Sequence, residues 1–120
     1  ANATDNRMAK KSAPANPSIF AQVCRTFRLP DPVAEFQFCA ERKWRTDYYF
    51  EANGRKVALE VEGGVHTGGR HVRAAGFKGD MEKYNALSTM GIFLVRVTPD
   101  SLMDVSTFTT LKKVLYGDHS

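Results

Sequence analysis

Residues 44–62 read WRTDYYFEANGRKVALEVE, and this stretch decides the fold. Two runs of alternating residues flank Asn53-Gly54, the pair that favours a two-residue type I′ turn because both positions of that turn need a positive φ. The stretch therefore predicts a β-hairpin. Alternation along its two strands gives one apolar face, which we expect to pack on the core and which carries Trp44, Thr46, Tyr48, Phe50, Val57, Leu59 and Val61.

The other face of the hairpin carries carboxylates. Residues equally far from the turn lie opposite each other, so Asp47 faces Glu60 and Arg45 faces Glu62, with Cβ atoms roughly 5 Å apart. Carboxylates this close repel unless one takes up a proton or a cation lies between them, and hard oxygen ligands suit Mg²⁺. The alternative is a solvated sheet face with ordinary cross-strand ion pairs, Arg45 with Glu62 and Glu51 with Lys56.

The elements around the hairpin predict an α/β (α+β) domain with a mixed central sheet. Hydrophobic spacing and turn residues favour a helix that Asn16 or Ser18 caps and that ends near 28, a strand over 33–40, the hairpin, a helix over 77–90, a strand over 92–98 and a last helix from 99 onward. The order is α-β-β-β-α-β with a C-terminal helix. We expect residues 1–16 to be a flexible leader and residues 17–120 to form a single domain.

The composition is that of an ordinary globular chain, with 42% hydrophobic and 25% charged residues among 120. A formal net charge of +4 suits a polyanionic partner such as DNA without requiring one. Cys24 and Cys39 lack metal-binding spacing, so we expect free thiols in a reducing compartment. No apolar run reaches the length of a membrane span, and the first residues lack the apolar region of a secretory signal, so no membrane partner is expected.

A glycine-rich basic loop is expected over residues 63–76, directly after the carboxylates. It brings His66, Arg70, His71 and Arg73 close in sequence, with Lys78 at the start of the following helix. Glycines leave backbone N–H groups free to face phosphate oxygens, and cations hold a nucleic-acid strand. The alternative is a solvated connection whose charged side chains contact nothing specific.

The chain resembles the PD-(D/E)XK nuclease superfamily through Asp47, the hairpin, Glu60-Val61-Glu62 and the α-β-β-β-α-β order, over about residues 17–98. The longer pattern, with GG-x-H-x-GG-R-H followed by D-x-E-K-x-N, looks closest to small phage and bacterial endonucleases of that superfamily. These are similar in turn to very-short-patch repair and junction-resolving nucleases. The resemblance implies a restriction-endonuclease-like fold.

Carried onto this sequence, the resemblance implies that Asp47, Glu60 and the Val61 carbonyl bind Mg²⁺ or Mn²⁺. Glu62 stands where the motif has its lysine, and we expect it to bind the same metal or a second one. Thr46 stands where the motif has its proline.

The motif's lysine usually orients the attacking water, so another cation is needed here. Lys83 or Lys78, from the second helix, would supply it. His66 would orient or deprotonate the water. Glu35, on the polar face of the first strand, is a further candidate ligand.

The function that the resemblance implies is a metal-dependent DNA endonuclease, which hydrolyses phosphodiester bonds to 5′-phosphate and 3′-hydroxyl ends. The alternative is a catalytically inactive nucleic-acid-binding module of the same fold. Branched, mismatched or nicked DNA and a short sequence all remain open as substrates, with DNA repair or recombination as the process. A phage origin would place the protein in the cytoplasm of a bacterial host cell.

The last helix bears on the oligomeric state. We expect its apolar residues to pack on the core of their own chain, and a homodimer formed through them is the alternative. These residues are Leu111, Val114, Leu115 and Tyr116.

Overall fold

The structure is a computed structural model that describes residues 17–63 and 73–117. Its elements are α2 (Pro17–Thr26), β1 (Val33–Cys39), β2 (Trp44–Ala52), β3 (Arg55–Val61), α3 (Arg73–Thr89), β4 (Ile92–Val97), the 3₁₀ turn η2 (Pro99–Ser101) and α4 (Val105–Tyr116). The predicted α+β class and the order α-β-β-β-α-β-α are confirmed. The leader expected over 1–16 lies outside the described residues.

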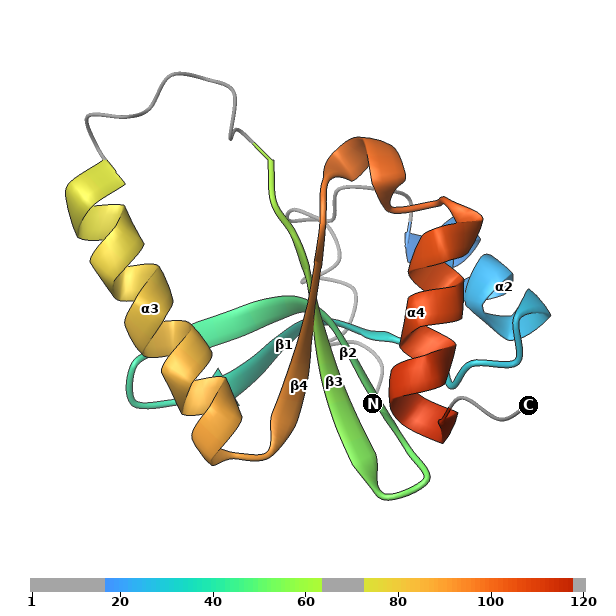
Figure 1. Cartoon of the computed structure of the whole chain (residues 1–120), viewed down its shortest axis with the longest axis horizontal. Helices are drawn as coiled ribbons and strands as arrows, with labels where there is room; N and C mark the ends of the chain where they lie inside the picture. The colour runs from blue at the N-terminus through green and yellow to red at the C-terminus, as the bar shows by residue number, and fades with distance from the viewer. Residues whose placement is uncertain (1–16, 64–72, 118–120) are drawn as a thin grey trace.

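The four strands form one mixed sheet in the order β1-β2-β3-β4. β1, β2 and β3 are antiparallel neighbours, whereas β4 runs parallel to β3 after the crossover through α3. Helix α3 lies on one side of the sheet, and α2 and α4 lie on the other (Figure 1). The sheet therefore has two covered faces, and β1 and β4 form its two edges.

The main core lies between the sheet and the pair of helices α2 and α4. The predicted apolar face of the hairpin supplies four of its fully buried side chains: Tyr48, Phe50, Val57 and Leu59. Val61 packs against this cluster, and Thr46 is buried beside it. Trp44 differs from the prediction, because it is only partly buried and its ring lies 4.1 Å from the Arg42 guanidinium.

A smaller cluster lies under α3, on the face of the hairpin that carries the carboxylates. It consists of Tyr49, Ala58, Leu87 and Ile92, with Phe36, Phe38, Tyr84 and Leu94 packed against it. The carboxylate face is therefore partly covered, rather than fully solvated. On the second helix Met81 is 47% and Met90 42% exposed, so the apolar residues of this helix are covered only in part. Residues 73–76, expected in a loop, already belong to α3.

The segment after β4 is broken into two helices instead of one. Thr98 and Ser101 hydrogen-bond each other through backbone and hydroxyl groups, and these bonds close the short turn η2. The Thr107 hydroxyl then donates to the Ser101 carbonyl at 2.7 Å and ties α4 to that turn. Leu111 and Leu115 are fully buried in the main core, as predicted, so they are not available as a dimer face.

No helix in the described ranges 17–63 and 73–117 combines the length and the apolar character needed to cross a membrane. Cys24 and Cys39 are both free thiols, as expected.

Candidate functional site

The candidate site lies where β2 and β3 separate. The predicted hairpin register holds from Ala52 opposite Arg55 as far as Tyr48 opposite Leu59, and the strand pairing stops there. Both turn residues, Asn53 and Gly54, have positive φ, at 57° and 75°. The turn prediction is therefore confirmed, and the change occurs only at the far end of the hairpin.

Side chains take over the hydrogen bonds of the ladder at this point. Asp47 Oδ2 accepts a hydrogen bond from the Val61 N–H at 2.7 Å. The Thr46 hydroxyl lies 3.0 Å from the Tyr48 carbonyl and 3.2 Å from the Leu59 carbonyl, so its single O–H is shared between these two acceptors. The two strands thus diverge without leaving these buried polar groups unpaired, which would cost free energy.

Glu60 is the most buried carboxylate of the site, with 9% of the residue exposed. Lys83, on α3, places its Nζ 2.9 Å from Glu60 Oε2. This contact is an ion pair outside the angular range of a hydrogen bond, so Oε2 has a charge partner but no directed donor. Burial raises the pKa of Glu60 above its ordinary value, Lys83 opposes that rise, and the nearby charges of Asp47 and Glu62 add to it.

Asp47 is half-buried, and its pKa is also raised, chiefly by burial. The hydrogen bond from Val61 lowers this pKa, while Glu35 and Glu62 raise it further through like charge. Glu35, at the corresponding place on β1, has a left-handed backbone with φ 52°. No described residue donates to the second oxygen of Asp47, Oδ1.

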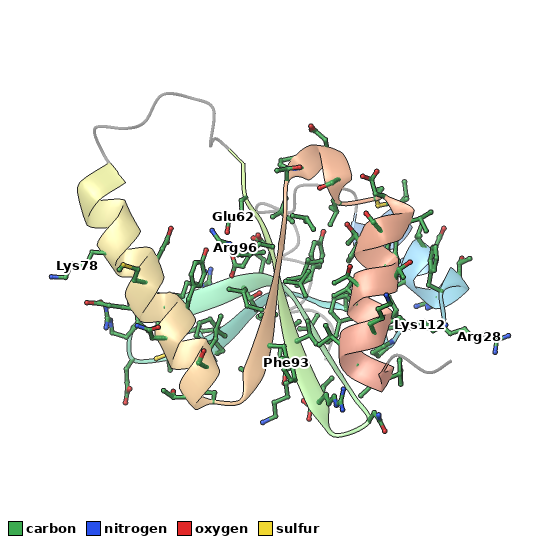
Figure 2. The ribbon with its side chains drawn as sticks, viewed as in Figure 1. Arg28, Glu62, Lys78, Phe93, Arg96 and Lys112 are labelled. Atoms are coloured by element: carbon green, nitrogen blue, oxygen red, sulfur yellow. The ribbon has the colours of Figure 1, made fainter. Side chains whose placement is uncertain are left out.

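Glu62 is held from α3 and β4. Its Oε2 accepts hydrogen bonds from Arg96 Nε at 3.0 Å and from the Tyr84 hydroxyl at 2.8 Å, and Figure 2 shows Glu62 and Arg96 side by side. The Arg96 guanidinium also lies 4.8 Å from the centre of the Tyr84 ring. Burial alone would raise the pKa of Glu62, but Arg96, Tyr84 and Lys83 outweigh it and lower that pKa. The side chain is therefore stabilised as a carboxylate.

The cross-strand ion pairs considered from the sequence do not form. Arg45 makes no ion pair with Glu62, which is engaged by Arg96 instead. Glu51 accepts a hydrogen bond from the Tyr49 hydroxyl at 2.8 Å rather than pairing with Lys56. The face is thus neither a solvated array of neighbouring pairs nor a set of carboxylates without partners.

The structure places the other predicted site residues as follows. Lys83 reaches the carboxylates, whereas Lys78 is exposed and points away from them (Figure 2). Arg73 is the first residue of α3. His66, Arg70 and His71 lie outside the described residues, so their roles stay predictions.

Sequence reasoning missed Tyr84 and Arg96. In the sequence Tyr84 lies among the apolar residues of a helix, so its hydroxyl gives no separate signal. Arg96 had one: it is the only charged residue in the strand IFLVRV, where a lone charge in an apolar run calls for a partner.

The carboxylate and carbonyl oxygens at this site are of the kind that binds one divalent cation with few protein ligands. Among residues 17–63 and 73–117, no three Asp, Glu, His or Cys side chains are grouped so that they could hold a metal ion together. Asp47 Oδ1, Glu60 and the Val61 carbonyl are nevertheless the type of donor that Mg²⁺ takes when waters complete its coordination. Among the described residues, Lys83 pairs with Glu60 and Arg96 pairs with Glu62.

Comparisons with protein-family models, with curated proteins and with solved structures find no match to this chain. The case for a function therefore depends on the residues themselves.

Proposed function

We propose that this chain is a metal-dependent endodeoxyribonuclease that acts in the bacterial cytoplasm. The observation that carries the proposal is the approach of Lys83 Nζ to 2.9 Å from Glu60, at the point where β2 and β3 separate and Asp47 bonds the Val61 N–H. Two carboxylates with raised pKa values beside a lysine form a site for a cation and a phosphate together. The glycine-rich basic segment that follows Glu62 in the sequence supports a DNA substrate.

Asp47, Glu60 and the Val61 carbonyl would hold Mg²⁺ or Mn²⁺. When bound, the ion would polarise a phosphoryl oxygen and neutralise part of the charge that develops on it. Glu62 would join this set only by releasing Arg96 and Tyr84, because both occupy its Oε2. The Val61 N–H fixes the orientation of Asp47, so its Oδ1 is directed without any cost at the moment of binding.

Lys83 takes the role that a strand lysine has in the motif that the chain resembles. Its ammonium carries three donors, and the ion pair with Glu60 directs none of them at Oε2. These donors can orient an attacking water or hold a phosphate oxygen. Lys83 is mostly buried, with 18% of its side chain exposed, so its position is constrained by packing.

A second candidate is a nucleic-acid-binding module without catalysis. One observation favours it: each of the three carboxylates already has a partner, Val61 for Asp47, Lys83 for Glu60, and Arg96 with Tyr84 for Glu62. Carboxylates whose partners all lie within the chain can contribute to the stability of the fold without taking part in catalysis. On this interpretation DNA binding needs no metal and weakens steeply with salt.

Cleavage assays distinguish the two candidates. The purified protein is tested with Mg²⁺, Mn²⁺ or EDTA on supercoiled plasmid, linear duplex, single strand and a synthetic four-way junction. Asp47→Asn and Lys83→Gln are compared with Glu51→Gln, a similar change on the same strand at an exposed carboxylate outside the site. Binding is followed in parallel by fluorescence anisotropy in EDTA.

We expect metal-dependent cleavage that Asp47→Asn abolishes and that Lys83→Gln lowers by about 10²–10⁴-fold, the range for a positioned proton-transfer or electrostatic group. Glu51→Gln should cleave like the wild type, and DNA binding should persist in all three variants. Cleavage that survives Asp47→Asn would place the site elsewhere. Binding without cleavage on every substrate would favour the second candidate.

A further inference from the structure

Strand β4 leaves one edge of the sheet unpaired. Among residues 17–63 and 73–117 it is the last strand in the order β1-β2-β3-β4, and its only neighbour there is β3. Neither α3 nor α4 crosses in front of this strand in Figure 1. An edge strand presents a row of main-chain N–H and C=O groups that another strand can pair with.

The direction of these groups follows from one hydrogen bond. The Val97 carbonyl accepts from the Glu62 N–H at 2.7 Å, so the polar groups of Val97 point toward β3. Main-chain groups alternate in direction along a strand, and those of Ile92, Leu94 and Arg96 therefore point outward. The Thr98 N–H is bonded to the Ser101 hydroxyl at 3.2 Å, which closes the free edge beyond Val97.

The two edges of the sheet differ in how they are protected. β1 has an irregular register between Gln37 and Cys39, a left-handed residue at Glu35 and Pro32 just before it. Bulges, charges and prolines are the usual devices against pairing with another chain. β4 has none of these, and its one charge, Arg96, is paired with Glu62.

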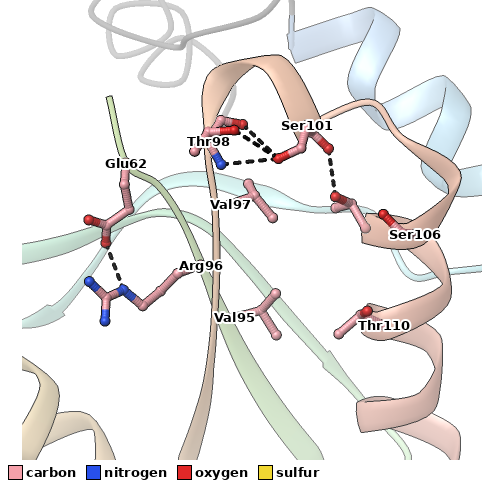
Figure 3. Close-up of a pocket in the computed structure, with 9 residues that line it drawn as sticks. Glu62, Val95, Arg96, Val97, Thr98, Ser101, Ser106 and Thr110 are labelled. Atoms are coloured by element: carbon pink, nitrogen blue, oxygen red, sulfur yellow. Dashed lines mark hydrogen bonds and ion pairs between the residues drawn. The ribbon is translucent and has the colours of Figure 1, made fainter. Parts of the chain in front are cut away.

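Hollows flank the unprotected edge on both sides. One, of about 440 Å³, lies toward α4 and is lined by Val95 and Val97 together with the hydroxyls of Ser106 and Thr110 (Figure 3). The other, of about 400 Å³, lies toward α3. Phe93 projects from the same edge and is 52% exposed. An added strand would thus meet both free main-chain groups and space for its alternate side chains.

We propose that β4 pairs antiparallel with β4 of a second copy of this chain, about a two-fold axis at Leu94. In this register Leu94 lies opposite Leu94 of the other copy, and Ile92 lies opposite Arg96. The main-chain groups of these residues point outward, so each facing pair exchanges both main-chain hydrogen bonds. Phe93 then lies opposite Val95 of the other copy, at the hollow beside α4. Aromatic and β-branched residues form a favourable cross-strand pair, and the contact is self-complementary.

Charge favours this register over its neighbour. About Leu94, the two copies of Arg96 lie four residues apart along the strands, or about 13 Å. About Val95 they would lie only about 7 Å apart, and Ile92 would face Thr98, whose N–H is already occupied. The proposal goes beyond the activity proposed above, since a chain that cuts no DNA would pair in the same way.

Sedimentation equilibrium and residue-resolved amide exchange test the pairing on the full chain. Phe93→Lys adds a charge to the edge, and Val33→Lys is its matched control, because Val33 is 48% exposed on the opposite edge strand. Both positions are open to solvent, and circular dichroism checks the fold. We expect a dimer whose dissociation constant rises by about tenfold or more in Phe93→Lys, the loss of one buried aromatic contact, and is unchanged in Val33→Lys.

The amides of Leu94 and Arg96 should become protected from exchange as the concentration rises, whereas those of Phe93 and Val95 should be protected at every concentration. A protein that stays monomeric at millimolar concentration overturns the proposal. So does a dimer that Phe93→Lys leaves intact, or one that forms without added protection at Leu94. A dimer lost in Val33→Lys instead would assign the interface to β1.

Discussion

Replacing Asp47 with asparagine should make the protein more stable in the absence of metal. The amide Oδ1 of asparagine can still accept the hydrogen bond from the Val61 N–H, so the contact that spans the two strands is kept. The change removes one of three neighbouring negative charges. Two like charges about 6 Å apart repel by nearly 3 kcal/mol at an effective dielectric constant of about 20.

The net gain is smaller, because Asp47 is half-exposed and the removed charge also attracts Lys83. We expect a gain of about 1 kcal/mol in the free energy of unfolding at pH 8. For a domain of 120 residues this corresponds to a rise of about 3–5 °C in Tm.

The gain should depend on pH in a defined direction. The pKa values of Asp47 and Glu60 are both raised in the folded protein. Folded and unfolded chains are equally protonated well below the ordinary values of 3.8 and 4.5, so there the two groups cost nothing. As pH rises through the raised pKa values, the carboxylates must ionise against their surroundings and the wild type loses stability. Asp47→Asn should therefore match the wild type near pH 3 and exceed it above neutrality.

Divalent cations should reverse this order. A ligand that binds only the folded state stabilises it by about 2.7 kcal/mol at one hundred times its Kd. Differential scanning fluorimetry in EDTA and in a Mg²⁺ or Mn²⁺ series should show Tm rising in the wild type and in Glu51→Gln, but not in Asp47→Asn. An Asp47→Asn variant that is less stable than the wild type in EDTA, or that responds equally to the cation, would refute the reasoning.

Two further predictions concern the supports of the site. Arg96→Gln should destabilise the protein by about 0.5–1 kcal/mol at pH 7, since the ion pair with Glu62 is half-exposed and partly screened. The pKa of Glu62 is lowered in the folded protein, so this loss of stability should depend on pH. Urea unfolding should show it above pH 4.5 and show it disappear as pH falls through the folded pKa of Glu62. Thr46→Val should cost about 1–3 kcal/mol, since the Leu59 and Tyr48 carbonyls lose their buried donor; urea unfolding of this variant with unchanged stability would show that the strands close without the hydroxyl.

The hairpin was predictable because its information is local. Asn53-Gly54 specifies a turn with two positive φ angles, and the register follows from the turn by counting. Counting failed only beyond Tyr48 and Leu59, where Asp47 and Thr46 bond the opposite backbone with their side chains. Such bonds depend on how far two strands have already separated, which no local pattern specifies.

The partners of Glu62 were not predictable in the same way. Arg45 is the nearest cation by hairpin register, whereas Arg96 reaches the site from a parallel strand 34 residues away. A crossover helix sets no register, because its length and packing can place the next strand at several offsets. The same helix explains the exposure of Met81: α3 packs on the sheet through Tyr84 and Leu87, and Met81 lies outside that contact at 47% exposed.

On the proposed function, Glu62 at the position of the motif's lysine and Lys83 on α3 belong to one arrangement. A lysine at position 62 would face the Arg96 guanidinium, which now lies 3.0 Å from Glu62 Oε2, and two cations would repel in a half-buried setting. Glu62 instead neutralises Arg96 and accepts from Tyr84, which fixes the part of α3 that carries Lys83. Lys83 and Tyr84 are adjacent in the helix, so the bond to Glu62 also limits where the Lys83 ammonium can lie. Glu62 thus helps to position Lys83 beside Glu60, where the proposed function needs a cation.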